Sequence, residues 1–278
     1  MWVDGEWDRN RADYDRMLDL PRSGWGWEYA RRAPTLKRAA HRVRRTHPVI
    51  VHRAPPLSNI NTSKEPSKVI RLRRRCLQAE EFGLHFFPDP DLSAFDTPAF
   101  WLPEVMSASL DAALAFEART QRNGTPMRLN DLPGERHYLI GPGRRPKLII
   151  AAKGYAAQLA VANDVLAIPQ AVYLSLTLGA GQLVGKNLGA VEEFSEFCSG
   201  GLPWKPQRGL APEKLRDAII ALDGELAGVP RRRIAEVVYG QAMIGELWDK
   251  DDQAYKKRTK RLVEKGIAIM EYGYRNLL

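Results

Sequence analysis

The chain has 278 residues, of which 44% are hydrophobic, and its 42 Lys and Arg residues outnumber its 33 Asp and Glu residues, giving a formal net charge of +9. This hydrophobic fraction excludes an intrinsically disordered chain, and the basic excess favours a polyanionic partner, either nucleic acid or an acidic membrane surface. Two cysteines are too few for a disulfide framework or a cysteine-based zinc site, so we expect a cytoplasmic protein.

The charge is unevenly distributed. Residues 1–76 carry 18 basic and 8 acidic side chains (net +10), residues 77–200 carry 9 and 14 (net −5), and residues 201–278 carry 15 and 11 (net +4). This change of sign predicts segments with different roles. Together with the elements below, it predicts a small basic helical domain at 1–45, a linker at 46–76, a central mixed β region at 77–163 and a helical DNA-binding domain at 164–278.

The first segment has short helical patterns followed by a basic run. Tyr14, Met17 and Leu18 have helical spacing, and Trp25, Tyr29 and Arg32 share a helical face. We expect Trp25 and Trp27 to pack in a small core and not to stack on nucleobases. Residues 31–45 are strongly basic, residues 46–67 are rich in Pro, Asn and Ser without periodicity, and a second basic run follows at 71–75. This composition predicts a linker.

The central segment has the patterns of short strands and turns. Residues 84–105 combine aromatic residues with proline, which predicts extended pieces and turns, and His137–Ile140, Leu148–Ala152 and Leu159–Val161 predict a small β-meander. Val165–Val184 is uncharged but contains proline and polar residues, so we expect a buried element, helix or strand, and not a membrane span. A helix is expected at Val191–Phe197.

The C-terminal segment has the clearest helical periodicity. Pro212 suits a helix N-terminus, and the hydrophobic residues Leu215, Ile219, Leu222 and Leu226 recur every three or four positions. A turn at Gly228–Pro230 precedes a second helix that ends at Gly240, with Ile234, Val237 and Val238 facing inward. The acidic residues at 249–252 are candidate caps for a long last helix.

The last helix is predicted to have one apolar and one basic face. Its apolar arc contains Tyr255, Thr259, Leu262, Val263, Gly266, Ile269 and Met270. Lysine and arginine neutralise DNA phosphates, arginine also recognises guanine, and a helix with one cationic face fits the major groove. The predicted DNA-binding residues are Arg231, Arg232, Arg233, Lys256, Lys257, Lys260, Arg261 and Arg275. From charge and periodicity alone, a solvated charged face stays an alternative.

Motifs in all three segments resemble those of a known family of regulators. The C-terminal ones are Leu222-Asp223-Gly224, Ala227-Gly228, Arg233-Ile234-Ala235-Glu236, Gly240, Trp248, the basic run Lys257–Arg261 and the closing residues Gly273–Leu278. The N-terminal and central ones are Tyr14, the run Trp25–Arg32, Phe82-Gly83-Leu84, Asp89-Pro90 and Trp101-Leu102-Pro103. In these motifs the chain resembles the FseA-type transcriptional activators of proteobacterial integrative and conjugative elements.

The resemblance implies a transcription activator of the element's transfer and excision genes. It further implies that the C-terminal domain, a helix-turn-helix variant, recognises promoter DNA, with RNA polymerase and a small antiactivator as candidate partners. The expected fold is mainly α with a small central β-meander, in a nucleoid-associated cytoplasmic protein. We expect no catalytic, metal or cofactor site, because no HExxH, GxSxG or complete phosphate-loop motif is present. The alternative function is an antiactivator-like module that binds a regulator and not DNA.

Overall fold

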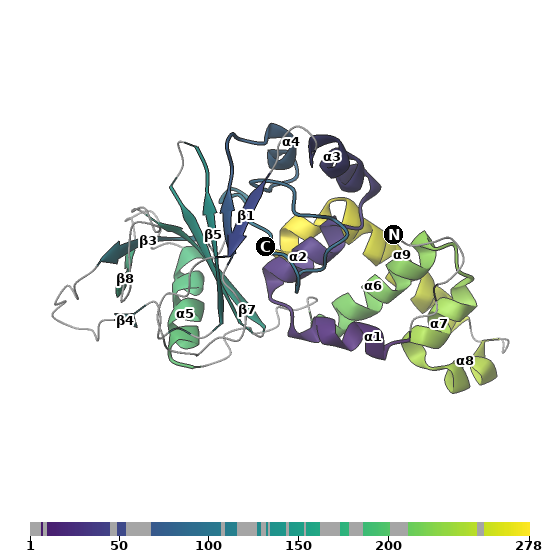
Figure 1. Cartoon of the computed structure of the whole chain (residues 1–278). Helices are drawn as coiled ribbons and strands as arrows, with labels where there is room; N and C mark the ends of the chain where they lie inside the picture. The colour runs from purple at the N-terminus through teal and green to yellow at the C-terminus, as the bar shows by residue number, and fades with distance from the viewer. Residues whose placement is uncertain are drawn as a thin grey trace.

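A computed structural model describes residues 7, 10–44, 49–53, 68–106, 109–115, 127–128, 132, 134–142, 145–152, 154–161, 173–177, 186–200, 211–248 and 253–278. Figure 1 shows a body of helices from both ends of the chain on one side and a twisted β-sheet on the other. The described residues are mainly helical, as expected, but the sheet is larger than the predicted meander.

The helical body contains elements from the beginning and the end of the sequence. Its N-terminal elements are α1 (Ala12–Asp15), the 3₁₀ helix η1 (Arg16–Asp19), α2 (Arg22–Ala30) and α3 (Pro34–Arg44), with α4 (Leu77–Glu80) beside α3. Its C-terminal elements are α6 (Pro212–Leu226), α7 (Arg231–Tyr239), α8 (Gln241–Leu247), α9 (Ala254–Glu271) and the 3₁₀ helix η5 (Gly273–Leu277). Helices α6 and α9 pack together most extensively, and η5 packs on α2.

The C-terminal helices form where the hydrophobic spacing predicts them. Pro212 is at the N-terminus of α6, and Leu215, Ile219 and Leu222 are buried, whereas the predicted fourth member of the stripe, Leu226, is 49% exposed because α6 ends there. Gly228 and Gly240 adopt positive φ angles of 68° and 99° after α6 and α7, a conformation that glycine allows at helix ends.

One glycine brings α6 and α9 unusually close together. A Cβ atom on Gly266 of α9 would lie 2.7 Å from the Ala218 carbonyl oxygen and 2.9 Å from the Leu222 Cβ. Any larger side chain would therefore force the two helices apart.

The connection between α7 and α9 contains an additional helix. Helix α8 lies between α7 and α9 and follows Gly240 directly, so the connection is longer than the usual three or four residues. The predicted cap at 249–252 lies outside the described residues. The helix-turn-helix variant therefore stays a prediction.

The sheet contains eight strands among the described residues, in the order β1-β2-β5-β6-β7-β3-β8-β4. Strands β5 (Glu135–Ile140), β6 (Lys147–Ala152) and β7 (Tyr155–Val161) form the predicted antiparallel meander. Strands β3 (Ser109–Ala115), β8 (Tyr173–Thr177) and β4 (Met127–Arg128) extend it on one side, where β3 pairs in parallel with β7. Helix α5 (Lys186–Cys198) contains the helix expected at Val191–Phe197 and covers one face of the sheet.

Two strands lie within the predicted linker. Strand β1 (Ile50–Arg53) pairs antiparallel with β2 (Lys68–Arg71), and β2 pairs in parallel with β5. The expectation of a linker throughout 46–76 is therefore wrong at these strands, because short hydrophobic runs such as Val69-Ile70 are buried by pairing with a distant strand. Residues 54–67 lie outside the described part of the chain.

One hydrophobic core crosses the predicted domain boundaries. It joins Tyr14, Trp25 and Trp27 from the N-terminal segment to Trp101 and to the C-terminal residues from Leu215 to Leu278. Both N-terminal tryptophans are fully buried, as expected, and are not available to stack on bases. The division of the chain into units that fold independently at residues 45, 76 and 163 stays a prediction. In the part of the chain that is described, no helix has the length and apolar character needed to cross a membrane.

Candidate nucleic-acid interface

Helix α9 separates a buried face from a basic one. Five residues of the predicted apolar arc, Thr259, Val263, Gly266, Ile269 and Met270, are buried, and the other two, Tyr255 and Leu262, are half-buried. The Thr259 hydroxyl donates a hydrogen bond of 2.8 Å to the Tyr255 carbonyl oxygen, so this buried polar group has a partner within the helix. The buried face fixes the rotation of α9 about its axis, and this rotation determines which side chains face solvent.

Five cations are exposed on the first part of α9. We call them the α9 cation cluster: Lys256, Lys257, Arg258, Lys260 and Arg261. Four of them are predicted site residues, and Arg258 was missed because it lies at the edge of the arc, beside Tyr255. Residues 254–263 contain no carboxylate, and the ion pair from Lys260 to Glu264 is long, 3.7 Å, between two well-exposed side chains.

Aromatic rings support two members of the cluster. The Lys256 ammonium lies 5.6 Å from the centre of the Trp248 ring, and the Arg258 guanidinium lies 5.5 Å from that of Tyr255. Tyr255 in turn contacts the Tyr239 ring at the end of α7, with 5.3 Å between ring centres. These contacts restrict the side chains without neutralising their charge.

The three predicted arginines of α7 lie apart from this cluster. Arg231, Arg232 and Arg233 occupy the first turn of α7, whereas Tyr239, at its last residue, contacts the start of α9. At 1.5 Å per residue, about 10 Å of helix separates the arginines from that contact.

Acidic neighbours reduce the net charge of the same arginines. Arg231 lies 3.8 Å from Glu225, and Arg232 and Arg233 lie 3.5 and 3.4 Å from Glu236. All three side chains are 43–48% exposed, so solvent weakens these pairs and the arginines stay accessible to a phosphate.

Arg275 lies beyond the opposite end of α9. It is exposed, as expected, but its guanidinium donates a hydrogen bond to the Glu81 carbonyl oxygen and lies 5.9 Å from the Tyr274 ring centre. About 15 Å of helix separates Arg261 from the end of α9. The structure therefore does not bring Arg275 together with the α9 cation cluster.

A buried ionic network joins Glu28 of α2, through Arg32 just beyond this helix, to Asp223 of α6. The Arg32 guanidinium donates to both oxygens of Asp223, at 2.6 and 3.0 Å, and to the Glu28 carboxylate at 2.7 Å. The Tyr14 hydroxyl donates to Asp223 at 3.1 Å and accepts a hydrogen bond from the Trp7 indole. Because the side chains of Arg32, Glu28 and Asp223 are at most 2% exposed, each charge depends on its partner.

The network changes the protonation equilibria of its members. Burial alone would raise the pKa of Glu28, but the positive charges of Arg32 and Arg31 outweigh this effect and lower it. Burial would likewise lower the pKa of Arg32, and Asp223 and Glu28 more than compensate, raising it. Burial and the nearby Asp223 raise the pKa of Tyr14. At neutral pH Glu28 is therefore a charged carboxylate, Arg32 a charged guanidinium and Tyr14 a neutral phenol.

Comparison with known proteins bears on this helical region. Residues 188–278 match the family model described as a T6SS transcription factor DNA-binding domain. The match covers α6–α9 and most of α5, whereas the first two-thirds of the chain lie outside it. No curated protein matches the chain. The family match supports a DNA-binding transcription regulator, the coarser part of what the sequence motifs imply.

Proposed function

We propose that this protein is a sequence-specific DNA-binding transcription regulator that contacts DNA through the α9 cation cluster. The observation that carries the proposal is the exposure of five cations on one helix, with no carboxylate between residues 254 and 263 and with the opposite face buried. The family match to residues 188–278 supports the same function.

The proposed contact combines phosphate neutralisation with base recognition. Lysines displace counterions from phosphates, and arginines donate two hydrogen bonds to the edge of guanine. A face of α9 that is buried from Thr259 to Met270 holds these side chains on a rigid element. In this proposal Arg231, Arg232 and Arg233 add phosphate contacts beside the main site, and Arg275 adds one at a distance from it.

We further propose that the protein activates transcription, as the resemblance to FseA-type activators implies. The target genes would then be transfer and excision genes of a conjugative element, with RNA polymerase and a small antiactivator as partners in the cytoplasm. The matching family is described by T6SS and not by conjugation. A reporter assay with promoters of conjugative-element genes and of T6SS genes distinguishes these targets, because the protein should activate only one of the two kinds of promoter.

The direct test is the salt dependence of DNA binding, measured by fluorescence anisotropy with the promoter region upstream of the protein's own gene. The variant Lys257→Gln/Lys260→Gln/Arg261→Gln removes three exposed cations from α9. With about 0.9 counterions released per phosphate contact, the slope of log K against log salt should flatten by roughly 2 to 3. The matched control, Arg38→Gln/Arg42→Gln/Arg71→Gln, removes three exposed cations elsewhere, and its slope should differ from the wild-type slope by less than about one.

An unchanged slope in the α9 variant, with its melting temperature preserved, would show that the cluster does not contact DNA. If the wild-type protein and both variants bind none of the promoters tested, the result favours the alternative function, a module that binds another regulator and not DNA.

A further inference from the structure

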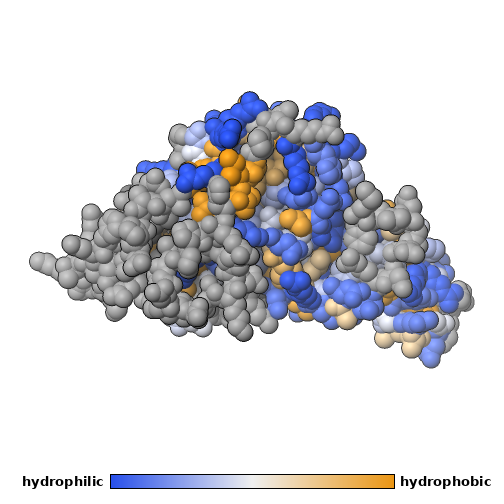
Figure 2. All heavy atoms as spheres, in the orientation of Figure 1, coloured by the Kyte–Doolittle hydropathy of each residue, from blue (hydrophilic) through white to orange (hydrophobic). Residues whose placement is uncertain are grey.

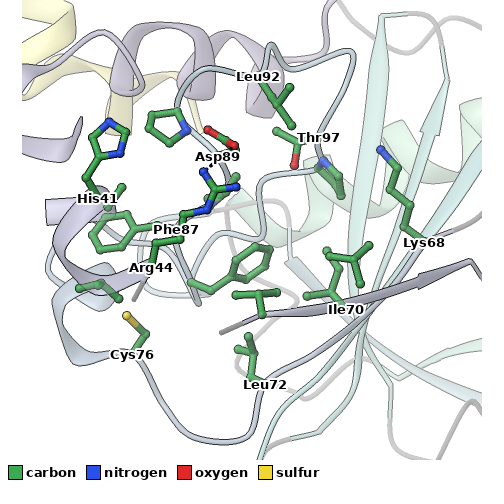
Figure 3. Close-up of a pocket in the computed structure, with 18 of the residues that line it drawn as sticks. His41, Arg44, Lys68, Ile70, Leu72, Cys76, Phe87, Asp89, Leu92 and Thr97 are labelled. Carbon is green, nitrogen blue, oxygen red and sulfur yellow. Dashed lines mark ion pairs between the residues drawn. The ribbon is translucent and has the colours of Figure 1, made fainter. Parts of the chain in front are cut away.

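A cavity lies between α3, the β1–β2 edge of the sheet and residues 86–98. Its volume is about 730 Å³, within the range of small-molecule sites in proteins. Figure 2 shows hydrophobic atoms gathered at this position, over β1 and beside α3, with hydrophilic atoms around them. Figure 3 shows the side chains that line the cavity.

The walls of the cavity are largely apolar. Helix α3 contributes Val43, strand β2 contributes Ile70, and the neighbouring segments contribute Leu72, Phe87 and Leu92. Val51 of β1, an edge strand, also lines the cavity and is 56% exposed. Displacement of water from this hydrophobic surface by an apolar molecule lowers the free energy and therefore favours binding.

The rim of the cavity carries an excess of positive charge. Among the residues that the structure describes, four cations line it, Arg44, Lys68, Arg73 and Arg74, against two carboxylates, Asp89 and Asp96. Arg44 forms an ion pair of 2.9 Å with Asp89, whereas the Lys68 ammonium donates to the Asp96 backbone carbonyl at 2.5 Å and so keeps its net charge. An anion at the rim would therefore be attracted by this excess of positive charge.

The two basic runs of the sequence meet at this rim. Arg44 belongs to the run at 31–45, and Arg73 and Arg74 belong to the run at 71–75. The pairing of β1 with β2 returns the chain to α3 and places both runs around one apolar cavity. The proposed DNA contact uses neither run.

We propose that this cavity binds a small amphipathic anion, namely a carboxylate with an apolar body, such as a medium-chain alkyl acid. The apolar walls would take the hydrocarbon part, and the rim cations would hold the carboxylate through charge-assisted hydrogen bonds. A neutral molecule would use the walls but not the rim, and a nucleic-acid backbone would use the rim but not the concave apolar interior. The proposal does not depend on DNA binding.

Isothermal titration calorimetry with decanoate and decanamide tests both halves of the site, because these probes differ only in the head group and its charge. The wild-type protein should bind decanoate about tenfold more tightly than decanamide, as expected for one or two charge-assisted contacts. The variant Lys68→Gln/Arg73→Gln should lose most of this preference while still binding decanamide. Arg38→Gln/Arg42→Gln removes the same charge from exposed α3 residues that do not line the cavity and should keep the preference.

A second variant tests the cavity itself. Val51→Trp places a bulky side chain at the mouth, on an edge strand where tryptophan is tolerated, and should weaken both probes at least tenfold. An unchanged melting temperature shows that the variants are folded. The proposal is overturned if the wild-type protein binds neither probe, if Val51→Trp binds both normally, or if the preference for decanoate survives in Lys68→Gln/Arg73→Gln.

Discussion

Replacing Asp223 by alanine should cost the protein much of its stability, because Asp223 is the acceptor at the centre of the buried network. The substitution removes two hydrogen bonds from Arg32 and one from Tyr14, and it leaves the Arg32 guanidinium, 2% exposed, with Glu28 as its remaining carboxylate partner. Removal of one partner of a buried ion pair typically costs 3–5 kcal/mol, and we expect about this loss in the free energy of unfolding. For a chain of this size the melting temperature should fall on the order of 10 °C.

Equilibrium urea denaturation, followed by circular dichroism, measures the effect. The matched control is Glu225→Ala, two residues away on α6, which removes an exposed ion pair of 3.8 Å to Arg231 and should cost less than about 1 kcal/mol. A double-mutant cycle with Arg32→Met isolates the pair. Once Arg32 is neutral, loss of Asp223 should be less harmful, so the double variant should be more stable than the sum of the two single effects predicts.

A loss for Asp223→Ala no larger than that for Glu225→Ala would refute the reasoning. Additive effects of Asp223→Ala and Arg32→Met would refute it in another way, since they would show that the two charges do not stabilise each other.

Two further predictions concern the same helical body. Leu277 and Leu278 are 4% and 8% exposed, so their deletion should lower the free energy of unfolding by roughly 3–5 kcal/mol through loss of buried apolar area. Differential scanning calorimetry should show a lower melting temperature. If the melting temperature is normal but DNA binding is lost, the tail contacts DNA or a partner directly. The Glu28 carboxylate, whose pKa is lowered from its ordinary value of 4.5, should contribute stability that is complete above about pH 4.5 and lost as the pH falls through the folded-state pKa. In Glu28→Gln, the free energy of unfolding measured by urea denaturation should therefore depend less on pH below pH 4.5. The same pH dependence in the variant and in the wild-type protein would show that Glu28 does not contribute in this way.

The sequence predicts the C-terminal helices well because their signals are local. The spacing of Leu215, Ile219 and Leu222, the proline at 212 and the glycines at 228 and 240 each act within one or two turns of helix. The three strands of the meander are predictable for the same reason, since β5, β6 and β7 pair with their neighbours in sequence.

Elements that depend on distant partners are not predictable in this way. Strand β2 is a strand because Val69 and Ile70 pair with Tyr138 and Leu139, about 70 positions later in the sequence. The chain terminus is another case. Leu277 and Leu278 are buried because η5 packs on α2, where Leu278 lies against Gly26. Burial can be expected from composition, whereas the buried partner depends on the tertiary fold.

The candidate DNA contact is likewise predictable only in part from the sequence. Helical periodicity alone places four of the five cluster cations on the exposed side of α9, and a wider arc would have included Arg258. The separation of Arg231 and Arg275 from the cluster depends on how α7 crosses α9 and on where η5 turns, and no local pattern contains that information.

The region that matches a DNA-binding domain does not bury all of its hydrophobic surface by itself. Leu278 packs against Gly26, the Tyr29 hydroxyl donates to the Leu215 carbonyl oxygen, and Asp223 has its charge partner in Arg32. A Cβ at position 26 would lie 2.9 Å from a terminal methyl carbon of Leu278, so this leucine side chain would have to shift. The N-terminal run Trp25–Arg32 and the C-terminal motif Leu222-Asp223-Gly224, far apart in sequence, thus form two sides of one contact. Because a buried charge without its partner is costly, the N-terminal helices act as a structural part of the helical unit that holds α9.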